Sequence, residues 1–249
     1  MYALLSPAKK LVNPSSREIS TSEPVFWNQS RALVRILKGL EVEQIRSLMK
    51  LSSSLGELNH QRYQQLSLTD ISGTAAALTF AGDTYVGLKV SDLDDASLRW
   101  SQNRVGILSG LYGLLRPLDR IEPYRLEMGT RLQNDKGKTL YDFWREHVAV
   151  EIQHRVKEHR DRRIVNLASA EYFNVVQTKD LSVVHPVFKD KKNGVYKVVS
   201  FYAKRARGSM AHQIIKNKIE DADRLKELNI DGYVYSPEQS DEQFWVFIR

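Results

Sequence analysis

The sequence contains no cysteine. This absence excludes disulfide bonds, thiolate peroxidase chemistry, and zinc or iron–sulfur sites with cysteine ligands. Long hydrophobic runs are missing as well, because no apolar segment approaches the ~18 residues that a membrane span needs. The chain also turns polar after its first five residues, unlike a signal peptide. We therefore expect a soluble, cytoplasmic protein.

Neither sign of charge dominates the composition, but the basic residues are clustered. The chain has 37 Lys and Arg against 30 Asp and Glu, a formal net charge of +7. Residues 189–207 hold seven of these cations and a single carboxylate, Asp190. Because clustered cations attract the phosphates of nucleic acids, the position of the charge is more informative than its total.

Apolar patterning predicts strands and helices interspersed along the chain. Residues 1–5 read as a buried strand, and a polar tract at 13–24 reads as a loop. Residues 139–159 form the longest amphipathic helical pattern, followed by a short apolar strand at 163–167. The order predicts a single mixed α/β domain over residues 1–249, with a central mixed β-sheet covered by helices.

A β-hairpin is predicted at Asn193-Gly194. These residues separate two β-branched and aromatic runs, 183–189 and 195–202. Asn-Gly suits such a turn because a type I′ turn needs positive φ at both central residues. The last helical region is predicted at residues 209–228.

The glycine-rich stretch at residues 108–129 is the most distinctive segment. Gly110 and Gly113 lie on either side of Tyr112, and Pro117 suits the first turn of a short helix. Glycine lets the backbone take positive φ and lets another backbone or a phosphate come close. The free N–H groups of a helical turn attract anions. The stretch therefore predicts either a hairpin that holds a phosphate or a tight turn packed under aromatic side chains.

Several long blocks stand in one order along essentially the whole chain. Besides the glycine-rich stretch they are LLSPAKKL at 4–11, FAGDTYVGL at 80–88, LYDFW at 140–144, NLASAEYF at 166–173 and PVFKDKKNGVYKVVSFYAKRARGSM at 186–210. Together these blocks resemble the bacterial YaaA family of peroxide-stress proteins. The resemblance implies a cytoplasmic DNA-binding protein with a helix-hairpin-helix element, linked to survival of hydrogen peroxide and control of free iron.

Two segments are predicted to contact DNA. The helix-hairpin-helix element is placed at the glycine-rich stretch, where the predicted contacts are Gly110, Tyr112, Gly113 and Arg116. The second segment ends a predicted strand and opens a predicted helix, where side-chain cations and helix N–H groups converge. Its predicted contacts are Lys204, Arg205 and Arg207. The alternative for this segment is a solvated charged face.

Two E-x-x-H pairs raise the question of iron. Glu57 with His60, and Glu151 with His154, have the spacing that places a carboxylate and an imidazole on one helical face in di-iron proteins. Such a site needs four long antiparallel helices and two further glutamates, whereas strands interrupt the helices here. We therefore predict exposed helix-face residues and no metal site.

Carboxylates in the family-like blocks offer an enzymatic alternative. Asp83 and Glu127, beside Lys9, could serve acid–base chemistry on a nucleotide or base. The structural alternative is a buried ion pair with an arginine such as Arg125. Ser6-x-x-Lys9 matches the S-x-x-K of serine acyl-transferases, but the companion motifs are absent.

Three hypotheses follow from the sequence. The leading one is a non-enzymatic protein that binds double-stranded DNA largely independently of sequence, with no cofactor and no obligate protein partner. The second is an enzyme acting on nucleic acid bases or nucleotides, and the third is an iron-binding protein. Convergence of Lys9, Asp83 and Glu127 in one cleft favours the second hypothesis, whereas an open basic surface favours the first.

Overall fold

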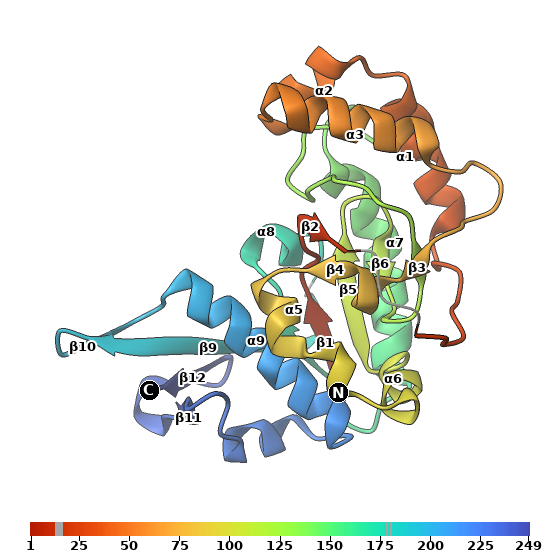
Figure 1. The fold of residues 1–249 in the computed structure, drawn as a ribbon. Coiled ribbons are helices and arrows are strands. Elements are labelled where there is room, and N and C mark those ends of the chain that lie inside the picture. Colours follow the sequence, from red (N-terminus) through yellow and green to blue (C-terminus); the bar gives the residue numbers. More distant parts are fainter. Residues whose placement is uncertain (13–16, 178, 180) are drawn as a thin grey trace.

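The computed structural model of the chain describes residues 1–12, 17–177, 179 and 181–249. The first four residues of the loop predicted at 13–24 lie outside that description. Eight strands form the main sheet, in the order β11-β12-β9-β8-β1-β5-β6, with β10 paired to β9 (Figure 1). Their bounds are β1 (Tyr2–Leu5), β5 (Val105–Ser109), β6 (Gly113–Leu115), β8 (Arg163–Leu167), β9 (Ser182–Lys192), β10 (Val195–Lys197), β11 (Val234–Tyr235) and β12 (Phe244–Ile248).

The centre of this sheet is parallel. Strands β12, β9, β8, β1 and β5 run in one direction, while β6, β10 and β11 are antiparallel to their neighbours. Ala3 of β1 lies opposite Val105 of β5 and Val165 of β8. All four residues of β1 are buried, as expected for a parallel strand covered on both faces. The buried strand predicted at residues 1–5 and the mixed α/β fold around a central mixed sheet are confirmed.

Helices cover the sheet. Helices α5, α6 and α9 pack together on one face, and α7 lies behind the sheet (Figure 1). The longer helices are α1 (Trp27–Lys38), α2 (Val42–Met49), α3 (Ser53–Gln65), α6 (Asp95–Ser101), α7 (Leu140–Lys157) and α9 (Ser200–Lys216). Short helices are α4 (Ala76–Thr79), α5 (Asp83–Leu88), α8 (Ala170–Phe173), η1 (Val90–Asp92), η2 (Ala222–Glu227) and η3 (Pro237–Gln239). Two small antiparallel pairs complete the fold: β2 (Lys10–Leu11) with β4 (Phe80–Ala81), and β3 (Thr74–Ala75) with β7 (Arg120–Ile121).

Helix α7 begins where its sequence predicts. Thr139 is the N-cap, and its side chain and that of Asp142 form a reciprocal capping box. Within the described ranges, no helix combines the length and the apolar character needed to cross a membrane.

Helices α5 and α9 touch backbone to backbone because glycines meet at their contact. A Cβ atom on Gly208 of α9 would lie 1.8 Å from the carbonyl oxygen of Thr84. A Cβ atom on Gly87 of α5 would lie 2.1 Å from the carbonyl oxygen of Arg205. The contact thus needs glycine on both helices, and it holds the first turns of α9 against the start of α5.

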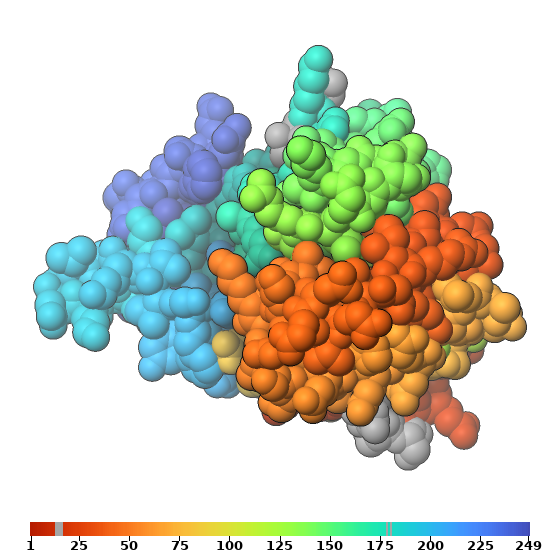
Figure 2. Space-filling view, turned by 90° about the horizontal axis from the view of Figure 1, so that it is seen from above, coloured from red at the N-terminus to blue at the C-terminus, as the bar shows by residue number. Residues whose placement is uncertain are grey.

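The predicted β-hairpin is confirmed. Strands β9 and β10 are antiparallel, with Val195 opposite Lys192, and the turn residues Asn193 and Gly194 have φ of 53° and 78°. Positive φ at both positions agrees with the type I′ turn that Asn-Gly favours. The end of β9, β10 and the start of α9 project from the body of the molecule (Figures 1 and 2).

The last long helix begins earlier than predicted. The strand predicted at residues 195–202 ends with β10 at Lys197, and α9 begins at Ser200 rather than near residue 209. Ala203 and Ala206 form part of the buried face of α9. Alanine is a good helix former and lets α9 lie close to α5, so the basic residues here belong to the body of a helix.

The helix-hairpin-helix element is not found at the glycine-rich stretch. Strands β5 and β6 flank the turn as an antiparallel pair, with Ser109 opposite Gly113. Pro117 begins no helix, because the chain turns back there with the Asp119 N–H donating to the Arg116 carbonyl at 3.1 Å. The physical reason is that all three residues of β6 are buried and pair with β5, which extends the sheet.

Candidate functional site

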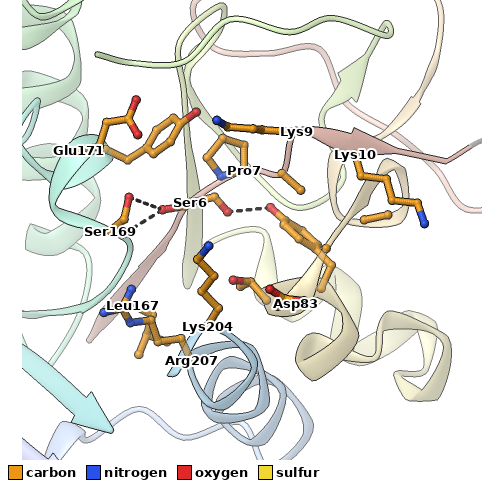
Figure 3. Close-up of a pocket in the computed structure, with 16 residues that line it drawn as sticks. Ser6, Pro7, Lys9, Lys10, Asp83, Leu167, Ser169, Glu171, Lys204 and Arg207 are labelled. Atoms are coloured by element: carbon orange, nitrogen blue, oxygen red, sulfur yellow. Dashed lines mark hydrogen bonds between the residues drawn. The ribbon is translucent and has the colours of Figure 1, made fainter. Parts of the chain in front are cut away.

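A cavity of about 470 Å³ opens at the carboxyl ends of β1 and β8 (Figure 3). Residues 6–10, which follow β1, form one wall, and Ser169 and Tyr172, which follow β8, lie on another. Residues 81–85 at the start of α5 and the first turns of α9 complete the lining. Four segments that are far apart in the sequence therefore meet at this site.

Hydroxyl groups lie between the ends of the two strands. The Ser169 N–H donates to the Ser6 Oγ at 2.9 Å, and the Ser6 hydroxyl donates to the Ser169 Oγ at 3.3 Å. The Tyr85 hydroxyl donates to the carbonyl oxygen of Ser6 at 3.1 Å (Figure 3). These bonds tie the loop after β1 to the loop after β8 and to α5. Ser6 therefore holds the cavity together, and among the described residues its hydroxyl hydrogen-bonds to Ser169 rather than to a carboxylate or an imidazole.

Two cations enter the cavity from α9. Lys204 extends from this helix toward Ser6, close to Asp83, whereas Arg207 extends toward Leu167 at the end of β8 (Figure 3). In the described part of the chain neither cation forms an ion pair with a carboxylate. The Nε atom of Arg207 is buried without a hydrogen-bond partner among the described residues, and burial lowers the pKa of its guanidinium group. The carboxylates of Asp83 and Glu171 also line the cavity, so it holds both signs of charge, with Lys204 and Arg207 outside any ion pair among the described residues.

The three candidate catalytic residues come together only in part. Lys9 and Asp83 both line the cavity. Glu127 lies beside it in a small adjoining space, where its Oε1 atom is 2.9 Å from the Lys9 Nζ and 3.0 Å from an Arg125 terminal nitrogen. Glu127 is therefore an ion-pair partner of two cations, which is the structural alternative that the sequence left open.

The residues of the glycine-rich stretch lie in the interior. A Cβ atom on Gly110 would lie 2.2 Å from the Leu126 carbonyl oxygen, and one on Gly113, where φ is +69°, would lie 2.6 Å from the Trp144 ring. Tyr112 is fully buried. The glycines thus admit neighbouring protein atoms, and the tight turn under aromatic side chains describes this stretch better than a phosphate cradle.

The other cations and the E-x-x-H pairs are dispersed. Arg205 is exposed on α9 outside the cavity, and Arg116 pairs with buried Asp119 at 2.8 Å. Glu151 pairs with Arg155 at 2.6 Å. Glu57 and His60 are on α3, and Glu151 and His154 are on α7, with no other metal-ligating side chain close enough to form a group of three among the described residues.

A second cavity, about 570 Å³, lies beside α7 and contains an unusual histidine. His159 contacts the Arg104 guanidinium and stacks on Tyr2 at 6.1 Å between ring centroids. Burial, with the charge of Arg104 adding to it, lowers the pKa of His159 from 6.5 to about 4. His159 is therefore neutral at pH 7.

This histidine predicts how stability depends on pH. Because its pKa is lower in the folded state, the unfolded state takes up a proton first as pH falls below 6.5. The contribution of neutral His159 to the free energy of unfolding is fully present above pH 6.5, and we expect it to fall by roughly 3 kcal/mol by pH 4. Urea unfolding across this range should show a smaller decline in His159→Gln. The exposed His154→Gln is the control, and an equal decline in His159→Gln and wild type would contradict the assignment.

Sequence reasoning missed Ser169, Tyr85 and Lys10 as lining residues. Ser169 comes two residues after β8, and a polar residue just after a buried parallel strand is a signal for the edge where ligands bind. Tyr85 offered no comparable signal, because its hydroxyl reaches Ser6 only through the tertiary structure.

Comparison with known sequences covers the whole site. The family described as peroxide stress protein YaaA matches residues 1–239. UPF0246 proteins of Magnetococcus marinus, Cereibacter sphaeroides and Ralstonia pickettii are 45%, 44% and 46% identical to this chain, over all of it and 99% of each relative. The match includes every segment that lines the cavity. Because it spans nearly the whole chain, the chain belongs to the YaaA family of peroxide stress proteins.

Proposed function

We propose that the protein acts in the response to peroxide stress by binding duplex DNA with little sequence preference. Any effect on free iron, which the resemblance implies, would follow from that binding. The main support is one observation: the projecting end of β9, β10 and the first turns of α9 (Figure 2) carry exposed cations that form no ion pair with a carboxylate among the described residues. We call this surface, residues 189–205, the basic arm.

The positive charge of the basic arm is free to meet phosphates. Its exposed cations are Lys191, Lys192, Lys197, Lys204 and Arg205. Among the described residues none of these five forms an ion pair with a carboxylate. The carboxylate of Asp190 is engaged elsewhere, 2.8 Å from Arg249 and accepting from the Tyr233 hydroxyl at 2.6 Å. Uncompensated surface cations release DNA counterions when they bind phosphates, which favours association.

Exposed aromatic side chains accompany these cations. Phe201 and Tyr202, in the first turn of α9, are 53% and 45% exposed. Large aromatic rings on a basic surface suit contact with sugars and bases, and stacking of this kind tolerates any base. Phosphate contacts carry no sequence information either. Both features favour binding without sequence preference.

The test replaces the three lysines of the β9–β10 hairpin by alanine: Lys191, Lys192 and Lys197. We expect weaker binding to a duplex and a flatter plot of log K against log salt concentration, by about 0.9 for each phosphate that the variant no longer neutralises. Fluorescence anisotropy with two duplexes of unrelated sequence measures affinity, salt dependence and sequence preference together. Both duplexes should lose affinity equally.

A matched control removes three exposed lysines outside the arm: Lys136, Lys138 and Lys157. The net charge falls by the same amount, so any effect of total charge appears in both triple variants. Wild-type affinity in the arm variant, or an equal loss in the control variant, would show that the basic arm is not the DNA-binding surface. If the affinity of the wild-type protein for duplex DNA did not depend on salt concentration, the proposal of binding through phosphate contacts would be wrong.

A further inference from the structure

The cavity lies where the order of the parallel strands reverses. From β1 the chain goes to β5 on one side, and the next parallel strand, β8, returns to the other side of β1. In open α/β sheets such a reversal leaves a crevice outside the carboxyl ends of the two strands, and ligands bind there. The lining residues that follow β1 and β8 occupy that crevice. Topology alone therefore marks this cavity as a ligand site.

The two cations of α9 favour an anion on their side of the cavity, apart from the carboxylates of Asp83 and Glu171 that also line it. Lys204 and Arg207 are on one face of α9, since residues three apart in a helix are neighbours. Among the described residues the Arg207 guanidinium forms no ion pair with a carboxylate, so its terminal nitrogens are free to donate to an anionic acceptor in the cavity. An arginine and a lysine together match a doubly charged phosphate better than a carboxylate.

Part of the remaining lining suits the uncharged portion of a small molecule, and the carboxylates of Asp83 and Glu171 can accept hydrogen bonds from its hydroxyl or amino groups. Pro7, Ala8 and Leu167 are apolar, and the Tyr85 and Tyr172 side chains add aromatic surface. The volume of about 470 Å³ lies within the range of small-molecule sites and is ample for a mononucleotide.

We propose that this cavity binds a small phosphorylated molecule of mononucleotide size, with its phosphate between Lys204 and Arg207. The cavity and the basic arm use different arginines. Arg207 lines the cavity, whereas Arg205, two residues earlier, is exposed on the arm and does not line it. Only Lys204 belongs to both surfaces.

Calorimetric titration of the full-length protein tests the proposal. The probes are inorganic phosphate, the four ribonucleoside 5′-monophosphates and adenosine. We expect one site per chain, tighter binding of at least one nucleotide than of inorganic phosphate, and binding of the uncharged adenosine at least about tenfold weaker than of AMP. Failure of phosphate and of all four nucleotides to bind at millimolar concentration would overturn the proposal.

Two neighbouring arginines provide a matched pair of variants. Arg207→Gln should weaken nucleotide binding at least about tenfold and leave duplex DNA binding and its salt dependence unchanged. Arg205→Gln should weaken duplex DNA binding and flatten its salt dependence, and it should leave nucleotide binding unchanged. Nucleotide binding that is unchanged in Arg207→Gln, or lost in Arg205→Gln, would show that the phosphate does not lie in this cavity.

Melting temperatures separate a binding role from a structural one. Because Arg207 has a desolvated charge without a partner, Arg207→Gln should melt no lower than the wild type when no nucleotide is present. Lower melting together with lost binding would assign Arg207 to the fold and count against the proposal. Lys204→Met, which keeps the apolar stem of an exposed side chain, should lose nucleotide binding without unfolding.

Discussion

Gly208→Ala is expected to lower the free energy of unfolding by about 3 kcal/mol or more. The added Cβ atom would lie 1.8 Å from the Thr84 carbonyl oxygen and 2.8 Å from the Leu88 nitrogen. Both are backbone atoms of α5, so no side-chain rotation relieves the overlap. The two helices must separate, which loosens the packing of α9 residues such as Met210 and Ile214. Urea unfolding measures the change.

Gly39→Ala is the control for this prediction. The nearest atom to its added Cβ is the Ile36 carbonyl oxygen at 3.4 Å, and φ is −82°, so alanine fits with little adjustment. Gly208→Ala should also weaken nucleotide binding, because α5 and α9 carry Asp83 and Arg207 to the cavity. Equal stability of the Gly39 and Gly208 variants would mean that the close contact of α5 and α9 is unimportant for the fold.

Arg116→Ala is expected to destabilise the protein by about 3 kcal/mol, because it leaves a buried carboxylate without its cation. Asp119 has no exposed side-chain surface and lies 2.8 Å from Arg116, which also donates to the Glu23 carbonyl at 2.9 Å. The Ser22 hydroxyl and the Arg116 N–H remain as donors, at 2.6 and 2.7 Å. These neutral donors reduce the penalty but do not replace the lost charge.

Two further variants show whether the charge of Asp119 is the cause. The double variant Arg116→Ala, Asp119→Asn should recover part of the lost stability, since the uncompensated charge is gone. Arg131→Ala removes an exposed arginine and should leave stability unchanged. DNA affinity per folded Arg116→Ala molecule should equal that of the wild type. A stable Arg116→Ala protein with a salt slope flatter by about 0.9 would instead support Arg116 as a phosphate contact.

The geometry of α9 explains how one short basic run serves two surfaces. Successive helical residues point about 100° apart, so the run from residue 203 to 207 cannot face one way. Ala203 and Ala206 are buried, Lys204 and Arg207 line the cavity, and Arg205 is exposed. The charge cluster seen in the sequence is therefore divided by the helix into an outer part and a part that lines the cavity.

Local features were predictable because a few adjacent residues determine them. The apolar run at residues 1–5 has a single favourable place, the covered centre of a parallel sheet. Asn193-Gly194 readily adopts the positive φ that a two-residue hairpin turn needs, and Thr139 with Asp142 satisfies the first N–H groups of a helix without outside help. The mixed α/β class follows from the order of such segments, and the family follows from the long blocks.

Which residues meet was decided only by the tertiary structure. The sequence alone indicates that some group packs closely against Gly110 and Gly113. The tertiary structure shows that these groups are the Leu126 carbonyl and the Trp144 ring, so the glycines are explained without a phosphate. Ser6, Ser169 and Arg207 come to one cavity because β1 and β8 are neighbours and because glycines let α9 touch α5. Contacts between distant segments depend on how whole faces pack, and that information is spread over the chain rather than held in any one motif.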